Sequence, residues 1–288
     1  MMLNVLSDDK KLKLIATVRK EELASHGRNR YKNIEWQVLD VEDTDLTKLA
    51  FVIGDASWVI NNIGIIKPYI HDDNPEEVER AIVVNALFPY RLAQAAALNG
   101  AKVLQIATDC VYSGAKGQYV ESDLHDALDV YGKTKSLGET PLSNVHHLRC
   151  SIIGPEPNSY ISFLEWFRRQ PQNAQVNGYT NHQWNGVTTL HFARLCRGII
   201  TTNMTLPHLQ HVVPAGSISK AELLKSFAKE YQRQDIIIKP VEAKTVIDRT
   251  LATENETLNR ALWVAAGYTE PPSIPQMVKE LAQFNYNW

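Results

Sequence analysis

The segment IATDCVYSGAKGQYVESDLHDALDVYGKTKSLGE, residues 106–139, joins the end of one apolar segment to a helical one. Its beginning completes KVLQIAT, residues 102–108, a run of β-type residues that predicts a buried strand. Its last part, residues 129–139, predicts a helix in which Tyr131 and Lys135 stand four positions apart. Strand, loop and helix in this order are the unit of a parallel sheet covered by helices.

The same alternation extends over the first 155 residues. Strands are predicted at residues 12–18, 34–41, 57–63 and 146–153. A short helix is expected from Asp43, capped by Thr44 or Asp45. A long amphipathic helix begins at Asn74 and Pro75 and ends near residues 99–100.

The remaining residues predict shorter and more varied elements. Helices are expected at 162–169, 189–201, 220–232 and 275–284, and strands at 209–213 and 236–240. We therefore expect an α/β fold with a Rossmann-like doubly wound parallel sheet in residues 1–155. Residues 156–288 would form a small C-terminal substrate lobe, with some segments returning to the core.

The composition is that of an ordinary globular domain. Among 288 residues, 30 basic and 32 acidic side chains give a net charge of −2, which gives no sign of a nucleic-acid surface or a membrane arm. Apolar stretches such as residues 81–87 are too short to span a bilayer, and the first 14 residues do not have the pattern expected of a secretion signal. Three widely spaced cysteines favour reduced thiols and a cytoplasmic location.

The glycine-rich turn of a dinucleotide-binding sheet does not occur in this sequence. Such a sheet begins with a strand, a G-x-G-x-x-G turn and a helix whose N-terminus binds the pyrophosphate. The first glycine here is Gly27, and residues 1–6 resemble the end of the helix that would follow the turn. We expect that the sequence is an incomplete form of a longer chain, or that a neighbouring segment fills the gap, and that cofactor affinity is weakened.

Tyr131 and Lys135 have the spacing needed to handle a proton. Reduction of a ketone by a nicotinamide cofactor requires a hydride and a proton, and a tyrosine can supply the proton if its pKa is lowered. A lysine one helical turn away lowers that pKa and can also bind the ribose of the cofactor. A hydroxyl at the end of the neighbouring strand, Thr108, can hold the substrate oxygen. A lone YxxxK also arises by chance, as a surface tyrosine beside a solvated lysine.

Basic residues follow the strand whose carboxyl end should bind the adenosine ribose. Arg19 and Lys20 suit the 2′-phosphate of NADP, whereas NAD-specific sites usually place a carboxylate there. Asp40 ends the next predicted strand and could accept a hydrogen bond from the adenine amine. The alternative is that Arg19 and Lys20 are solvated surface residues. The sequence thus favours NADP, with NAD as the alternative.

The run of residues 106–139 resembles the core of extended short-chain dehydrogenases/reductases. The resemblance is to the dTDP-4-dehydrorhamnose reductase-like, sugar-nucleotide-modifying members. VINNIG (59–64), LRCSIIGPE (148–156) and GYTNHQWNGVTT (178–189) resemble further landmarks of that group in the same order. The match extends over nearly the whole chain.

This resemblance implies roles for individual residues. Thr108, Tyr131 and Lys135 would be the catalytic triad, with Tyr131 as the acid. Asn61 and Asn62 would line the cofactor, unless they merely cap a turn. Asp109, Cys110, Arg149 and Trp184 would contact the nucleotide-sugar substrate, although Trp184 could pack in the core and Arg149 could form a structural ion pair. Asn85 lies where such enzymes often carry a helix-disrupting asparagine.

The sequence departs from related enzymes directly after Thr108. Related 4,6-dehydratases follow this threonine with Asp-Glu, but here Asp109 and Cys110 follow, so Cys110 cannot serve as that base. Rhamnose-type reductases generally carry an aromatic residue at the position of Cys110. No metal site is expected: His146 and His147 would point to opposite faces of a strand.

Three functions remain open from the sequence. The first is an NADP(H)-dependent reductase of a 4-keto-6-deoxy nucleotide sugar, in which Tyr131 donates the proton. The second is a non-catalytic, sugar-nucleotide- or partner-binding regulatory subunit of the same fold, which the missing glycine turn favours. The third is a nucleotide-sugar epimerase that uses the same tyrosine–lysine pair. A homodimer is compatible with each of them.

Overall fold

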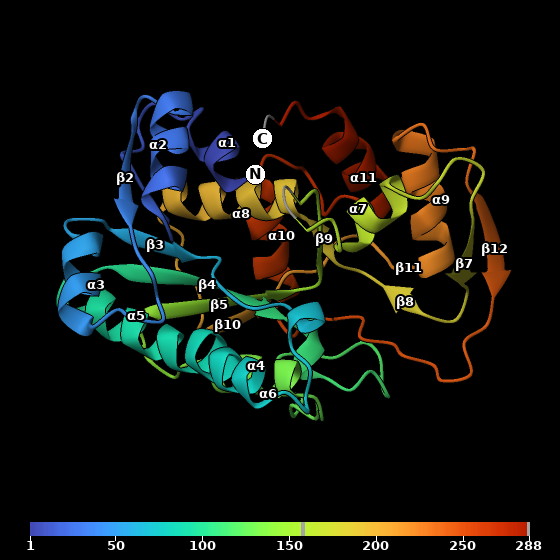
Figure 1. The fold of residues 1–288 in the computed structure, drawn as a ribbon, viewed down its shortest axis with the longest axis horizontal. Helices are drawn as coiled ribbons and strands as arrows, with labels where there is room; N and C mark the ends of the chain where they lie inside the picture. Colours follow the sequence, from blue (N-terminus) through green and yellow to red (C-terminus); the bar gives the residue numbers. More distant parts are fainter. Residues whose placement is uncertain (157–158, 287–288) are drawn as a thin grey trace. The chain divides into compact units, whose positions relative to one another are not determined.

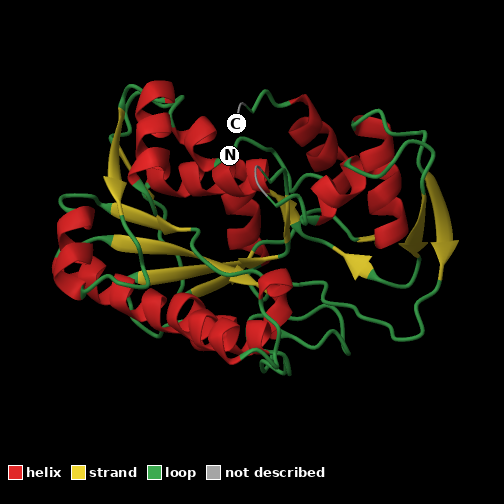
Figure 2. Cartoon of the chain, in the orientation of Figure 1, coloured by secondary structure: helices red, strands yellow, loops and turns green. Residues whose placement is uncertain are grey.

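The structure is a computed structural model that describes residues 1–156 and 159–286. The chain divides into two compact units. The first contains residues 1–107, 128–147 and 206–208, and the second contains residues 108–127, 148–205 and 209–288. Both units contain helices and strands (Figures 1 and 2).

Helices and parallel strands alternate in the first unit. In chain order they are α1 (Met2–Leu6), β1 (Leu14–Val18), α2 (Glu21–Arg30), β2 (Ile34–Val38), α3 (Leu46–Ile53), β3 (Trp58–Asn61), η1 (Lys67–Tyr69), α4 (Pro75–Ala81), η2 (Ile82–Leu87), α5 (Phe88–Leu98), β4 (Lys102–Thr108) and α6 (Val130–Leu137). β5 (Val145–Cys150) begins in this unit and ends in the second. Helix capping follows the sequence expectations, because Asp45 accepts a hydrogen bond from the amide of Lys48 and Asn74 accepts from that of Glu76.

The parallel strands of the first unit form two separate sheets. β1 pairs only with β2, in parallel register from Leu14 opposite Ile34 to Val18 opposite Val38. β3 pairs with β4 in a sheet of order β10-β5-β4-β3. No strand among the described residues pairs with the second edge of β1 or of β3. The sheet is therefore interrupted between β1 and β3.

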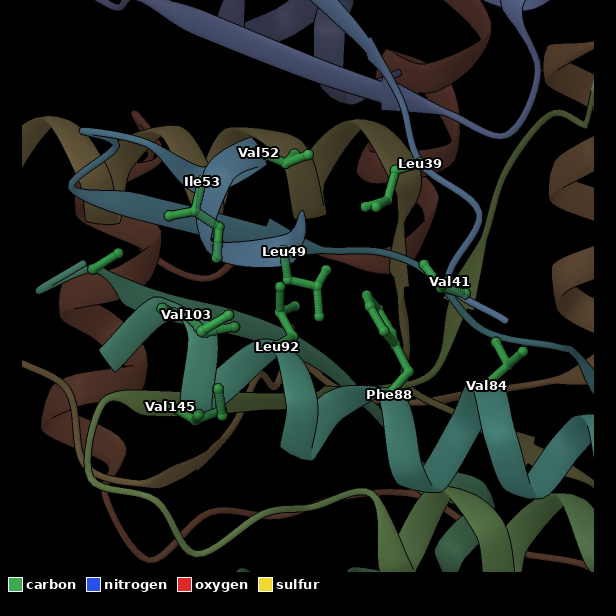
Figure 3. Close-up of a cluster of buried hydrophobic side chains, with 14 residues drawn as sticks. Leu39, Val41, Leu49, Val52, Ile53, Val84, Phe88, Leu92, Val103 and Val145 are labelled. Atoms are coloured by element: carbon green, nitrogen blue, oxygen red, sulfur yellow. The ribbon is translucent and has the colours of Figure 1, made fainter. Parts of the chain in front are cut away.

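The core of the first unit lies between this sheet and its helices. The cluster includes Leu49, Val52 and Ile53 of α3 and Phe88 and Leu92 of the long helix, and Figure 3 shows Leu49 beside Leu92. Val103 of β4 and Val145 of β5 contribute from the strands. Each fully buried side chain of this size contributes roughly 1.5–3 kcal/mol to folding. This core packs α3 and the long helix against β3 and β4.

The long helix predicted after Asn74 contains a π-helical turn. α4, η2 and α5 continue one another from Pro75 to Leu98, and η2 is the π-helical part. By length and composition this stretch is the one helix among the described residues that could cross a membrane. More than half of its most apolar window is buried inside the protein, and α5 packs on α3. This burial is the pattern of a core helix.

The second unit combines helices with short strands. Its elements are η3 (Asp109–Val111), β6 (Ile152–Ile153), α7 (Phe163–Arg168), β7 (Gln175–Tyr179), β8 (Gln183–Trp184), β9 (Val187–Thr188), α8 (Thr189–Thr202), β10 (Leu209–His211), β11 (Ile218–Ser219), α9 (Lys220–Glu230), β12 (Ile237–Val241), α10 (Glu256–Ala265) and α11 (Ile274–Gln283). β6 pairs with β9 and β7 with β12, both in parallel, whereas β8 and β11 are antiparallel. α9 packs against β7 and β12.

The sequence expectations differ from the structure in a few elements. The strand predicted at 146–153 is divided into β5 and β6, since the carbonyl of Ser151 accepts a hydrogen bond from Val187 and draws β6 to β9. α2 was not expected, because only Ala24 and Gly27 of this helix are buried and it has no apolar stripe. α10 was not expected either, although Asn255 caps it and Asn259, Leu262 and Trp263 are buried at i, i+3 and i+4.

We predict that the free edges of β1 and β3 are weakly protected from hydrogen exchange. Half of the amides of a strand point to each neighbour, and those without a partner strand open more easily. The amides of β3 that point away from β4 should exchange at least about tenfold faster than those of β4, which has a strand on both sides. Native-state hydrogen exchange measures this difference. Equal protection on both edges of β3 would contradict the interrupted sheet.

Candidate active site

Thr108 ends β4 and begins the second unit. Its hydroxyl accepts a hydrogen bond from the amide of Cys110 (3.2 Å) and donates one to Oδ1 of Asp109 (3.3 Å). Only 9% of Thr108 is exposed. Burial raises the pKa of the Asp109 carboxyl, against the lowering effect of Arg249 and Lys220. The backbone turn after β4 therefore fixes the orientation of the Thr108 hydroxyl.

Tyr131 and Lys135 lie on α6 in the first unit. Asp129 caps this helix by accepting a hydrogen bond from the amide of Gly132 (2.7 Å), and the i, i+4 spacing places both side chains on one face. Tyr131 is half-buried, whereas Lys135 is buried. The Lys135 ammonium donates to the carbonyl oxygen of Ile106 in β4 (3.3 Å). Burial lowers the pKa of Lys135 to about 8, which the carboxylate of Glu139 partly opposes.

Asn85 occupies the π-helical turn and connects two parts of the site. Its Oδ1 accepts a hydrogen bond from the amide of Ile65 (2.8 Å), and its Nδ2 donates to the carbonyl of the same residue (3.0 Å). Nδ2 also donates to the hydroxyl of Thr134 on α6 (3.4 Å). The widened turn thus turns a buried carboxamide toward the loop after β3 and toward α6, as π-turns at functional sites often do.

Gly138 allows α6 to approach this turn closely. A Cβ atom at Gly138 would lie 2.0 Å from the carbonyl oxygen of Asn85, which is backbone and cannot rotate away. A Cβ atom at Gly64 would lie 3.3 Å from Asn85 Oδ1 and 3.9 Å from Lys135 Nζ. The loop after β3, the π-turn and Lys135 are therefore neighbours in the first unit.

We predict that Gly138→Ala destabilises the chain and reduces its activity together. The added methyl group must push α6 from the π-turn, and overpacking of this kind costs about 1–3 kcal/mol. Urea unfolding measures the loss, and steady-state kinetics should show a fall in kcat because Tyr131 moves with the helix. Leu137→Ala is the matched control, since Leu137 on the same helix is exposed. An alanine variant of Gly138 with unchanged unfolding free energy would contradict this packing.

A pocket of about 180 Å³ lies at the carboxyl ends of β1, β2 and β3. Arg19 lines it, together with Val18, Leu39, Gly64 and the ion pair of Arg80 with Glu42. Among the residues predicted to bind the cofactor, the structure brings Arg19 to this pocket. Lys20 is exposed at the N-terminus of α2 and is not among the lining residues.

The other predicted cofactor residues have structural partners or lie on the surface. Asp40 accepts a hydrogen bond from the amide of Glu42 (3.1 Å) and holds the turn after β2. Asn61 is buried, donates to Oε1 of Gln105 (2.7 Å) and accepts from the amide of Ile63 (3.0 Å), so it shapes the loop after β3. Asn62 is exposed beside it.

The predicted substrate residues separate into two groups in the second unit. Arg149 is fully buried and forms hydrogen bonds with the hydroxyl of Tyr112 (2.6 Å) and with the rings of His211 (2.8 Å) and His125 (2.7 Å). Asp109, Cys110 and Trp184 instead surround a different cation, Lys220. The indole nitrogen of Trp184 donates to the hydroxyl of Ser151 (2.9 Å), which fixes the ring.

Lys220 and Arg249 were not recognised from the sequence. Lys220 is the first residue of α9, its ammonium lies over the rings of Phe163 and Trp184, and burial lowers its pKa to about 8. A cation at the positive end of a helix is unfavourable, so SISKAE, residues 217–222, contained a recognisable anomaly. Among the described residues, no group of three or more His, Cys, Asp or Glu side chains could hold a metal ion.

Residues 12–286 match the model of the RmlD substrate binding domain family. The chain belongs to this family. It is 35% identical over 173 residues to the dTDP-4-dehydrorhamnose reductase of Aggregatibacter actinomycetemcomitans, which covers 58% of this chain and 56% of the relative. It is 33% identical over 104 residues to the spore coat polysaccharide biosynthesis protein SpsK of Bacillus subtilis, which covers 33% of this chain and 37% of the relative. The matches thus span little more than half of these curated relatives, or less.

A solved structure extends the similarity to almost the whole chain. The dTDP-4-dehydrorhamnose reductase of Bacillus anthracis, crystallised in complex with NADP, superposes with a TM-score of 0.71 at 20% identity. The match covers 93% of this chain and 97% of that one. The RmlD-type α/β fold expected from residues 106–139 is therefore confirmed, as is the expected family.

Proposed function

We propose that the chain is an NADPH-dependent reductase of a 4-keto-6-deoxy nucleotide sugar. The observation that carries the proposal is the buried Lys135, which lies one turn from Tyr131 and is tied to β4, the strand that ends at Thr108. The reductase names of the relatives support the choice of substrate. A lysine buried in this way without function would be costly, because desolvation disfavours its charge.

The residues present fit the 2′-phosphate and the ribose hydroxyls of a nicotinamide dinucleotide better than they fit its pyrophosphate. Arg19 in the pocket suits a 2′-phosphate, and Lys135 suits ribose hydroxyls. The pyrophosphate needs close backbone approach at glycines, and residues 1–26 contain none. Bound in this way, the cofactor would supply the hydride.

The side chains would divide the remaining work. Tyr131 donates the proton to the substrate oxygen, and the ammonium of Lys135 favours the tyrosinate that results. Thr108 orients the keto oxygen through its hydroxyl, whose direction Asp109 and the amide of Cys110 fix. Within the described residues Cys110, Cys150 and Cys196 form no disulfide, which fits a reducing compartment such as the cytoplasm. A homodimer stays a prediction that light scattering can check.

We predict that Tyr131→Phe abolishes NADPH oxidation with dTDP-4-keto-6-deoxy sugars. Loss of a general acid typically costs about 10²–10⁴ in kcat. In the wild type, kcat/KM should fall as the pH rises through about 8, because Lys135 loses its proton there and no longer stabilises the tyrosinate. In Lys135→Arg this alkaline limb should move upward, since arginine stays protonated. A wild-type chain that is inactive on every keto sugar while binding a protein partner would favour the regulatory subunit instead.

We also predict that Arg19 selects NADPH over NADH. Arg19→Ala should raise KM for NADPH about tenfold or more and leave that for NADH nearly unchanged, because only NADPH carries the 2′-phosphate. Lys20→Ala is the matched control: its side chain lies outside the pocket and its kinetics should match the wild type. An equal loss with both cofactors would show that Arg19 acts on the fold.

A further inference from the structure

The hydroxyl of Thr108 has one proton and two lone pairs, and its neighbours compete for them. The amide of Cys110 donates to its Oγ1 (3.2 Å), which uses one lone pair. Oγ1 also lies 3.3 Å from Oδ1 of Asp109. If Asp109 is ionised, only the threonine can supply the proton of this second hydrogen bond, because a carboxylate can only accept. If Asp109 is protonated, its carboxyl group can supply the proton instead.

The direction of this hydrogen bond decides what Thr108 can offer to a substrate. A keto oxygen has no proton, so it accepts a hydrogen bond and cannot donate one. When Thr108 donates to the carboxylate of Asp109, its only remaining site is a lone pair, which repels a keto oxygen. When the acid donates to Thr108, both lone pairs of Oγ1 are occupied and the threonine proton is free for the keto oxygen.

The surroundings of Asp109 favour the protonated carboxyl group. Only 8% of the residue is exposed, and burial, the largest influence, raises the pKa of the carboxyl. Lys220 at the start of α9 and Arg249 after β12 act in the opposite direction but do not offset burial. Two thiols also lie near the carboxyl group. Cys110 Sγ is 3.8 Å from Oδ1, and burial together with the field of Asp109 raises the pKa of the Cys150 thiol, so that it stays neutral.

We propose that Asp109 acts in its protonated form to position Thr108: the acid donates a hydrogen bond to Oγ1, and the threonine donates its own proton to the keto oxygen of the substrate. The inference rests on the proposed function, since it concerns the same keto oxygen. Asp109 keeps its proton throughout, and Tyr131 supplies the proton that the product retains. The hydrogen bond from Thr108 strengthens as negative charge develops on the oxygen during hydride transfer.

The pH dependence of catalysis tests the proposal. kcat/KM for NADPH oxidation with a dTDP-4-keto-6-deoxy sugar is compared between the wild type and Asp109→Asn, whose carboxamide can donate to Thr108 and does not ionise. In the wild type, kcat/KM should fall about tenfold or more as Asp109 loses its proton. Asp109→Asn should lack this step and keep the fall near pH 8 that belongs to Lys135. Glu256→Gln, which removes an exposed carboxylate on α10, is the control and should keep both steps.

NMR of the aspartate carboxyl groups makes the test independent of catalysis. In protein labelled with ¹³C at the aspartate side chains, the signal that is missing from Asp109→Asn reports the ionisation of Asp109. Its pKa should lie above the ordinary value of about 3.9, and higher still in Thr108→Val, because the threonine hydroxyl lowers the pKa of Asp109. The proposal is overturned if Asp109 titrates at or below its ordinary value, or if kcat/KM is unchanged across the pH at which it titrates.

A double-mutant cycle separates positioning of Thr108 from a structural role of Asp109. Asp109→Leu removes the donor and should lower kcat/KM about tenfold or more, whereas Asp109→Asn should retain most of it. In Thr108→Val no hydroxyl needs orientation, so the added Asp109→Leu change should alter kcat/KM by less than about twofold. An equal loss in both backgrounds would overturn the proposal. A chain that shows the raised pKa of Asp109 but oxidises no NADPH with any keto sugar would overturn the reductase proposal alone.

Discussion

The carboxamide of Asn85 is the interaction on which the candidate site depends. A regular α-helix directs all its backbone hydrogen bonds along its own axis, and the π-turn widens the helix at Asn85. The buried side chain can then hold Ile65 through both backbone groups and reach Thr134 on α6. A single polar group thus fixes the loop after β3 and the helix of Tyr131 relative to the same helix. If the buried carboxamide of Asn85 had no hydrogen-bond partners, the folded state would be destabilised by about 1–3 kcal/mol.

Much of this arrangement could be predicted from the sequence, for physical reasons that differ between elements. The strand predicted at 102–108 and the helix predicted at 129–139 depend on local sequence patterns, and both are confirmed, the helix as α6 with Asp129 as its cap. The spacing of Tyr131 and Lys135 fixes their common face in the same way. By contrast, the burial of Lys135 depends on Ile106 and Gly64, which are distant in sequence, so no local pattern could show it.

The second unit was harder to predict because its strands are very short. β6, β8, β9 and β11 each have two residues and exist through pairing with distant segments, not through their own composition. Lys220 illustrates the same limit. Its position at a helix start is readable, but its two aromatic neighbours come from α7 and β8. Arg149 shows the converse, since a charged residue in a predicted strand proved to be the centre of a buried network with Tyr112 and two histidines.

The interrupted sheet has a mechanical consequence. β1, β2 and α2 contact one another closely, but no backbone ladder within the described residues joins them to β3. A pair of strands that shares no backbone ladder with the larger sheet is a candidate for opening as a unit, with a lower free energy than the rest of the domain. Arg19 lies between β1 and α2 and would move with them, whereas Lys135 lies on α6. A ligand that contacted both Arg19 and Lys135 would connect the two sheets, and part of its binding free energy would oppose the opening of β1, β2 and α2. Such a ligand would stiffen the domain more than its affinity alone would suggest.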